Sequence, residues 1–113
     1  MTSGDIIWKS ESPFAEPPRD FVKRAKRLLE GRVQAAYIFG SYLTSAFRPG
    51  SDVDLLLVKN TDVPFWERAR EFDDLYDLYP RLDVLVYTPK ELAAQLENPS
   101  GFWKSVKKTL RPL

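Results

Sequence analysis

The sequence contains neither cysteine nor histidine. The absence of cysteine excludes a disulfide framework and a thiolate metal site. The absence of histidine removes the side chain that most often acts as a general base or binds a transition metal near neutral pH. Any chemistry in this chain must therefore depend on carboxylates, hydroxyls, lysine and arginine side chains, and the backbone.

Long apolar runs and a strong net charge are also lacking. The longest apolar run is about five residues, against the roughly 20 that span a bilayer, and the N-terminus lacks the charged and apolar segments of a signal peptide. Seventeen basic residues oppose sixteen acidic ones, so net charge gives no attraction to nucleic acid or to an anionic membrane. We expect a cytoplasmic protein that binds neither nucleic acid nor a membrane.

What remains is an ordinary globular composition, with 43% hydrophobic and 13% aromatic residues. A length of 113 residues suits one domain with its own core, so we treat residues 1–113 as a single domain. Proline and serine are frequent in residues 10–18, which predicts an extended lead-in over residues 1–18. The motifs described below lie within residues 34–97.

The hydrophobic pattern alternates between helices and strands. Helices are predicted at 19–30, 41–47, 64–78, 89–97 and 102–110, and strands at 33–39, 52–58 and 81–87. The connection formed by residues 40–51 is barely long enough for a parallel crossover. We therefore predict an α/β (α+β) fold with a small, mixed three-stranded sheet flanked by helices.

Two short motifs occur where the first predicted strand ends and the second begins. Gly40 and Ser41 end the first strand, and Asp52 and Asp54 open the second after ten intervening residues. Strand side chains alternate, so both carboxylates point to one face, with Cα atoms roughly 6.5–7 Å apart. Carboxylates with open positions suit Mg²⁺, while a glycine turn and a serine hydroxyl at a helix start suit a phosphate.

Asp83 is the only polar side chain within residues 82–86 and therefore needs a partner. A metal site shared with the neighbouring strand would supply one. Taken alone, Asp52 is typical of a turn or a cap, and Asp83 is typical of a structural hydrogen-bond acceptor. Their joint occurrence with the glycine turn favours a triphosphate-and-metal site for in-line displacement at phosphorus.

The pattern formed by Gly40, Ser41, Asp52, Asp54 and Asp83 resembles the signature of the minimal nucleotidyltransferases of the polymerase-beta-like superfamily. The resemblance implies a nucleotidyltransferase-like fold in which Asp52 and Asp54 bind two Mg²⁺ ions. Asp83 would bind the catalytic ion and help activate the attacking hydroxyl. Gly40 and Ser41 would hold the phosphates of the nucleotide.

The resemblance also implies a reaction and a partner. A nucleoside monophosphate, AMP from ATP, would be moved to a hydroxyl of a partner protein or small molecule, with release of pyrophosphate. Minimal nucleotidyltransferases commonly pair with a helical HEPN-type toxin. The implied biological role is therefore that of the antitoxin in a HEPN/MNT toxin–antitoxin pair.

The phosphate half of the motif departs from this family. Members often carry arginine and glycine where this chain has Thr44 and Ser45, and a threonine supplies no guanidinium to a triphosphate. Arg48 either substitutes for the arginine or is a surface residue of a turn. The alternative function is a catalytically weak, nucleotidyltransferase-like binding module that neutralises or scaffolds a partner protein.

Five aromatic residues lie in the terminal or peripheral elements. Core packing is the expected role of any one of them, but their number favours a subunit contact for some, with a partner protein or in a homo-oligomer. They are Trp8, Phe14, Trp66, Phe102 and Trp103.

Asp73, Asp74 and Asp77 form an acidic cluster on the third predicted helix. A metal site is one interpretation, but a solvated helix face balanced by Arg68 and Arg70 is favoured.

Overall fold

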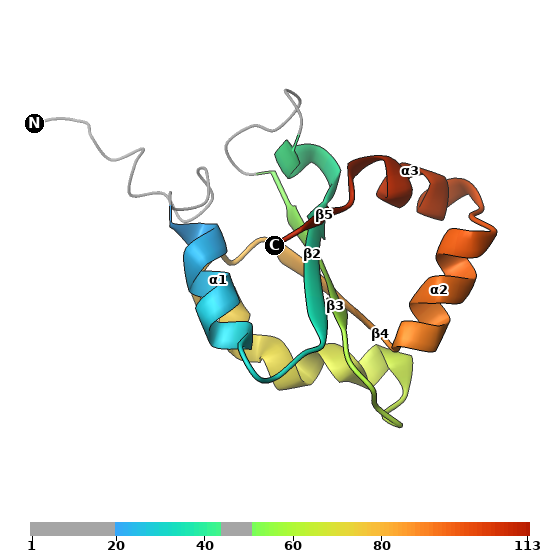
Figure 1. Ribbon diagram of the computed structural model, residues 1–113. Coiled ribbons are helices and arrows are strands. Elements are labelled where there is room, and N and C mark those ends of the chain that lie inside the picture. The colour runs from blue at the N-terminus through green and yellow to red at the C-terminus, as the bar shows by residue number, and fades with distance from the viewer. Residues whose placement is uncertain (1–19, 44–50) are drawn as a thin grey trace, which may run out of the picture.

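The computed structural model describes residues 20–43 and 51–113, and the account below concerns those residues (Figure 1). It shows one sheet with helices on both faces. In chain order the elements are α1 (Phe21–Leu29), β2 (Ala35–Phe39), the 3₁₀ helix η2 (Gly40–Leu43), β3 (Val53–Val58), the 3₁₀ helix η3 (Phe65–Asp77), β4 (Leu82–Tyr87), α2 (Pro89–Glu97), α3 (Gly101–Thr109) and β5 (Arg111–Pro112).

The sheet is mixed, as the short connection between the first two strands predicts. Its strand order is β4-β3-β2-β5. Strands β3 and β4 are parallel, whereas β2 is antiparallel to both β3 and β5. The predicted sheet has three strands and the observed one has four, because two residues after α3, Arg111 and Pro112, pair with the edge of β2. A strand of two residues leaves no hydrophobic period in the sequence.

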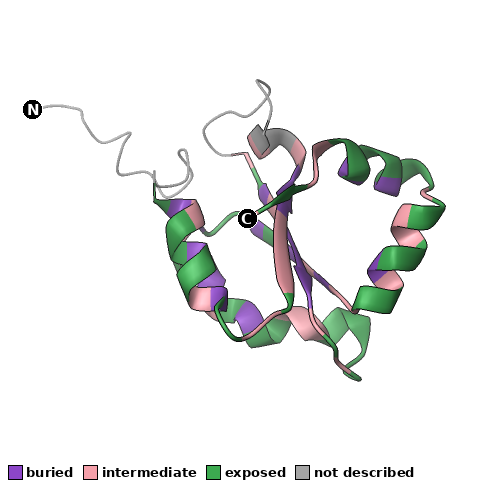
Figure 2. Cartoon of the chain, in the orientation of Figure 1, coloured by how far each residue is buried: buried purple, intermediate pink, exposed green. Residues whose placement is uncertain are grey.

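Helices cover both faces of the sheet, which explains the unbroken apolar sequence of β3. Leu55 and Leu57 pack in the core beside α1 and η3, while Leu56 and Val58 pack in a second core beside α2 and α3. All four are buried (Figure 2). A strand that is apolar on both faces is typical of a sheet covered on both sides. In Figure 1 the two helical layers lie to the left and right of the sheet.

Helix α2, which the sequence predicts at 89–97, begins with a capping box. The Thr88 hydroxyl accepts a hydrogen bond from the Glu91 N–H at 3.1 Å, and the Glu91 carboxylate accepts one from the Thr88 N–H at 2.9 Å. These two bonds satisfy backbone donors that have no partner within the helix. Pro89 occupies the first turn, where a missing N–H costs nothing.

The predicted helix at 64–78 is present but is not a regular α-helix. Its residues form the 3₁₀ helix η3, which is interrupted at Phe72 by non-helical backbone angles of φ −111° and ψ 25°. Phe72 and Leu75 are both buried against the sheet. Tertiary packing of these two side chains therefore overrides the local helical preference.

The remaining predicted elements agree with the structure where it describes them. The helix predicted at 41–47 is observed as η2, a single turn that begins at Gly40, and residues 44–50 lie outside the described residues, as does the lead-in at 1–18. Within the described ranges, no helix is long and apolar enough to cross a membrane.

Candidate active site

The candidate active site lies where β2 ends and where β3 and β4 begin. Asp54 of β3 is paired with Phe39 of β2 on one side and with Asp83 of β4 on the other. Residues directly opposite one another on neighbouring strands point to the same face of a sheet. The glycine turn after Phe39 and the two carboxylates therefore meet at one end of the face that α2 and α3 cover.

Gly40 lies directly against the carboxylate of Asp54. Its φ is +86°, in the left-handed region that glycine adopts without strain. A Cβ at this position would lie 2.5 Å from Asp54 Oδ2. Both the backbone angle and the space therefore require glycine here.

Asp54 holds its proton unusually well. Its pKa is raised from 3.8 to about 6, mainly because burial penalises the charged form. The negative charges of Asp83 and Asp52 and a hydrogen bond with Asp83 raise the pKa further. No positive charge contributes to this shift, so a bound cation would relieve an existing electrostatic cost.

Asp52 occupies a different environment from the other two predicted ligands. It is exposed, accepts a hydrogen bond of 3.1 Å from Arg81 Nε and forms an ion pair of 3.0 Å with the same guanidinium. In the part of the chain that the structure describes, no three acidic residues lie close enough together to hold a metal ion. The structure thus brings together Asp54 and Asp83 and leaves Asp52 at the edge with Arg81. The role of all three as metal ligands stays a prediction.

The residues at this end of the sheet nevertheless fit a magnesium ion. Mg²⁺ usually takes one or two protein carboxylates and completes its shell with water and phosphate oxygens. Asp54 and Asp83 supply two adjacent carboxylates, and Gly40 lies against one of them, where any side chain would clash. Asp52 would have to exchange its bond with Arg81 for the ion.

Helix α3 fixes the glycine turn from the far end of the sequence. The Gly40 N–H donates a hydrogen bond of 2.9 Å to the hydroxyl of Thr109, the last residue of α3. In a phosphate-binding turn, a backbone N–H at this position would donate to the phosphate. Sequence reasoning missed Thr109 because the contact joins residues 69 positions apart, and a threonine at a helix end carries no signal for it.

A small cavity opens beside the carboxylate pair. Its volume is about 240 Å³. Its lining residues are Phe39, Asp54, Asp83, Val84, Leu85 and Phe102. Two carboxylates and an otherwise apolar wall are the composition of a site that binds a ligand with a charged end and an apolar end.

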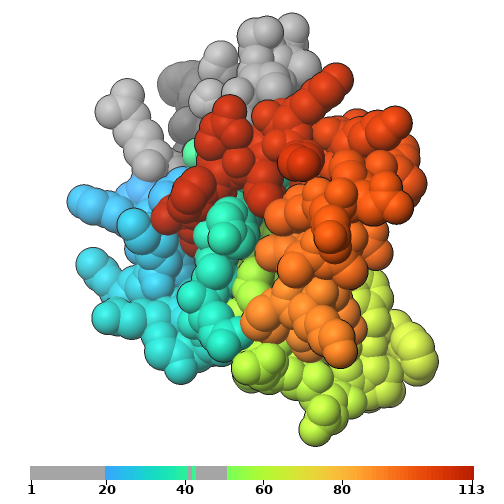
Figure 3. All heavy atoms as spheres, turned by 45° about the vertical axis from the view of Figure 1, so that its right-hand side comes forward, coloured from blue at the N-terminus to red at the C-terminus, as the bar shows by residue number. Residues whose placement is uncertain are grey.

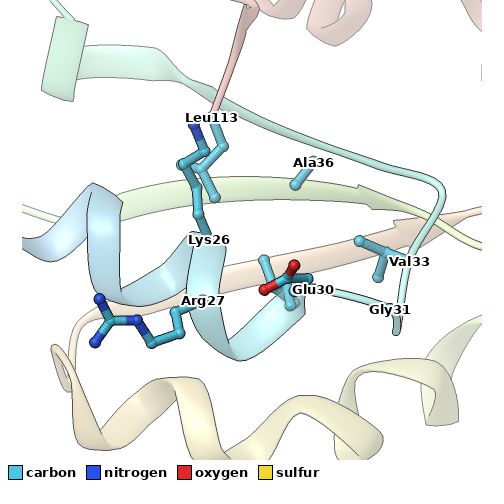
Figure 4. A pocket seen from close by; sticks show the side chains of 8 residues that line it. Lys26, Arg27, Glu30, Gly31, Val33, Ala36 and Leu113 are labelled. Atoms are coloured by element: carbon cyan, nitrogen blue, oxygen red, sulfur yellow. The ribbon is translucent and has the colours of Figure 1, made fainter.

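A larger cavity of about 490 Å³ lies on the opposite face of the sheet, between α1 and β2 (Figure 4). Lys26, Arg27 and Glu30 border it, and Leu113 and Ala36 form part of its apolar wall. Its single carboxylate, on Glu30, has no second carboxylate beside it in the lining. The larger cavity therefore lacks the pair of acidic ligands that phosphate-and-metal chemistry requires.

The side chains of several predicted residues lie outside the part of the chain that the structure describes. Ser41 lies in η2 next to Gly40, and its side chain is outside the described residues, as are Thr44, Ser45 and Arg48.

The acidic cluster on η3 has a structural partner. Asp74 accepts a hydrogen bond of 2.8 Å from Arg32, and Arg68, which the sequence suggested as its balance, instead pairs with Glu91.

Comparison with protein families identifies this combination of fold and site. The model of the nucleotidyltransferase domain family matches residues 18–110, which is most of the chain. The chain belongs to this family. The match includes the glycine turn, all three aspartates and both C-terminal helices. Searches of curated proteins and of solved structures gave no match. Family membership supports nucleotidyl transfer and confirms the fold class, and it leaves the substrate and metal to be tested.

Proposed function

We propose that this nucleotidyltransferase domain transfers AMP from ATP, in the presence of Mg²⁺, to a hydroxyl group of a partner protein or small molecule. The observation that supports this most is the pair Asp54–Asp83, held against a glycine that has no room for a side chain. A fold gains no stability from two adjacent carboxylates without a cation. Such an arrangement is typical of a site that is completed by a metal and a phosphate.

The proposed reaction is a displacement at phosphorus. The acceptor oxygen bonds to the α-phosphorus of ATP, the bond from that phosphorus to the pyrophosphate oxygen breaks, and pyrophosphate leaves. Asp83, which is exposed at the strand end, accepts the proton of the attacking hydroxyl. Asp54 would hold the metal ion, and the Gly40 turn orients the triphosphate. Bound Mg²⁺ would supply neutralisation of the charge that develops on the phosphate oxygens.

The direct test is transfer of label from ATP that carries the label on its α-phosphate. The purified chain is incubated with Mg²⁺ and the product of the adjacent gene as acceptor. Asp54→Asn and Asp83→Asn should each reduce transfer at least about a hundredfold, because each removes a negative charge that would bind the metal. Asp77→Asn changes an exposed carboxylate on η3 and should leave the rate unchanged. Undiminished transfer by the double variant Asp54→Asn/Asp83→Asn would disprove the site.

We propose that the acceptor is a helical HEPN-type protein and that the pair forms a toxin–antitoxin system. The domain is small, so an acceptor site built by a partner is the simplest arrangement. Labelling of that protein, and loss of its toxicity only with the active chain, would support this role. If toxicity is suppressed equally by the Asp54→Asn variant, transfer is not the means of neutralisation.

The second candidate function is a binding module with little catalytic activity. An exposed apolar patch formed by Val63, Phe65 and Trp66 favours it, since 78% of Trp66 is accessible and large aromatic residues anchor many interfaces. Calorimetry with Mg²⁺-ATP separates the two functions. Absence of binding up to millimolar nucleotide would favour the binding module, whereas micromolar binding would favour the enzyme.

A further inference from the structure

An exposed aromatic ring borders the acidic pair, and we infer that it binds the base of the nucleotide. Phe102 of α3 is 56% exposed and lines the same cavity as Asp54 and Asp83. We propose that the ring of Phe102, which packs edge-to-face with the buried Phe39, forms a stacking surface for the purine ring. This inference rests on the proposed function, because it assigns the far end of the nucleotide whose phosphates lie at the carboxylates.

The edge-to-face arrangement of the two rings leaves aromatic surface on which the ring of a base could stack. Phe39 and Phe102 have centroids 6.3 Å apart and planes at 84°. In such an edge-to-face pair the rings do not cover one another as a parallel stack does. Phe39 is buried and Phe102 is more than half exposed, so the accessible aromatic surface belongs to Phe102.

The backbone that carries Phe102 is firmly anchored. Its neighbour Trp103 is buried and makes edge-to-face contacts with Phe102 at 5.7 Å and with Tyr87 of β4 at 5.1 Å. Val106, one turn further along α3, is also buried. A side chain on an anchored helix needs little ordering when a ligand binds, which favours affinity. Figure 3 views the molecule from the side on which α2 and α3 lie.

The order of residues places the two rings directly beside the proposed phosphate site. Phe39 directly precedes Gly40, whose turn lies against Asp54, and α3 packs against this turn as well as against β2. A base linked through ribose to phosphates at Gly40 thus starts next to the two rings. The cavity of about 240 Å³ is smaller than the roughly 300–1,000 Å³ of a site for a whole ligand. It suits a part of the nucleotide.

The chemistry of the wall predicts how bases are distinguished. Apart from the two carboxylates, the described residues that line the cavity are apolar: Phe39, Val84, Leu85 and Phe102. Stacking on a ring face depends on the area of the base and tolerates different edges. We therefore expect Mg²⁺-ATP and Mg²⁺-GTP to bind within about threefold of one another and Mg²⁺-CTP to bind more weakly.

The test compares two ligands that differ only in the nucleoside. Calorimetry is performed with Mg²⁺-ATP and with Mg²⁺-tripolyphosphate on the wild-type chain and on Phe102→Leu and Phe102→Tyr. Phe102→Leu keeps an apolar side chain but loses the ring, so it should weaken ATP binding about tenfold. It should change tripolyphosphate binding by less than about twofold, and Phe102→Tyr should bind both ligands like the wild type.

The control is Trp66→Leu, which removes an exposed aromatic ring. Trp66 follows Phe65, whose ring contacts Tyr87 at the other end of the sheet. This variant should bind both ligands normally. Unchanged ATP binding by Phe102→Leu would overturn the stacking surface, and so would equal weakening of ATP binding and tripolyphosphate binding. Neither result would overturn the proposed function. Failure of the wild-type chain to bind either ligand would overturn both the stacking surface and the proposed function.

Discussion

Two carboxylates at opposite ends of the parallel strands β3 and β4 differ sharply in their surroundings. Glu91, just beyond the end of β4, receives hydrogen bonds from Arg68 at 2.7 and 3.2 Å and from the Thr88 N–H. The Arg68 hydrogen bond is the main cause that lowers the pKa of Glu91 to about 2. Asp54, at the start of β3, faces another carboxylate, and its pKa is raised to about 6.

The difference separates a carboxylate that is paired within the fold from one that we propose to be part of the active site. Arg68 donates to the backbone oxygens of Val63 and Val86 as well as to Glu91, so this end of the sheet is electrostatically matched within the chain. The end that holds Asp54 is not matched by any group that affects its pKa. Such an unmatched carboxylate is typical of a functional site, and it supports the proposal that Asp54 binds a cation.

The largest expected effect comes from closing the space beside Asp54. Gly40→Ala would force a residue with a Cβ into φ +86° and place that Cβ 2.5 Å from Asp54 Oδ2. We expect a loss of about 2–4 kcal/mol in the free energy of unfolding, measured by urea denaturation. Nucleotidyl transfer should fall at the same time, because the turn must move away from the carboxylate.

Gly31 offers a matched control for this substitution. Its φ of +77° is similar, but a Cβ there would meet no atom within 4 Å. Gly31→Ala should therefore lose only the backbone contribution of about 1–2 kcal/mol. Equal losses for both alanine variants would show that Asp54 does not limit the space at Gly40.

The residues around Asp54 show what the sequence can and cannot predict. The strand predicted at 52–58 is observed as Val53–Val58, and the helix predicted at 89–97 is observed as Pro89–Glu97, because their signals lie within a few neighbouring positions. The meeting of Asp54 with Asp83 followed from both residues lying near the start of a strand. The Thr109 contact, the exposed ring of Phe102 and the strand β5 were not predicted, since they depend on how the C-terminal segment returns to the sheet.

The next effect in size has the opposite sign. The raised pKa of Asp54 means that the folded state loses stability as the pH rises from about 4 to 6, where the unfolded carboxyl is already ionised. Asp54→Asn should therefore stabilise the chain by roughly 1–2 kcal/mol above pH 6, although we expect it to reduce transfer strongly. Thermal melts in metal-free buffer should show this gain disappearing below pH 4. A variant that is less stable than wild type at pH 7 would contradict the unmatched charge.

Glu91→Gln should do the reverse at the other end of the sheet. The lowered pKa of Glu91 contributes stability above pH 4.5, which is lost as the pH falls towards 2. Because the Glu91 side chain is 44% exposed, we expect the variant to lose only about 1 kcal/mol at pH 7. The same melts should show wild type and variant converging near pH 2. Glu97→Gln, an exposed change at the end of α2, serves as the control.

The smallest expected effect concerns the Gly40 N–H, for which the Thr109 hydroxyl and a bound phosphate would compete. Thr109→Val removes the acceptor of the Gly40 N–H and should reduce stability by about 1 kcal/mol, whereas Thr109→Ser keeps the hydroxyl. If a phosphate uses the same N–H, the wild-type chain must break this bond when nucleotide binds. Thr109→Val should then bind Mg²⁺-ATP about two- to fivefold more tightly in calorimetry, in spite of its lower stability. Weaker binding would instead show that Thr109 holds the turn in its nucleotide-binding shape and that the phosphates depend on other donors.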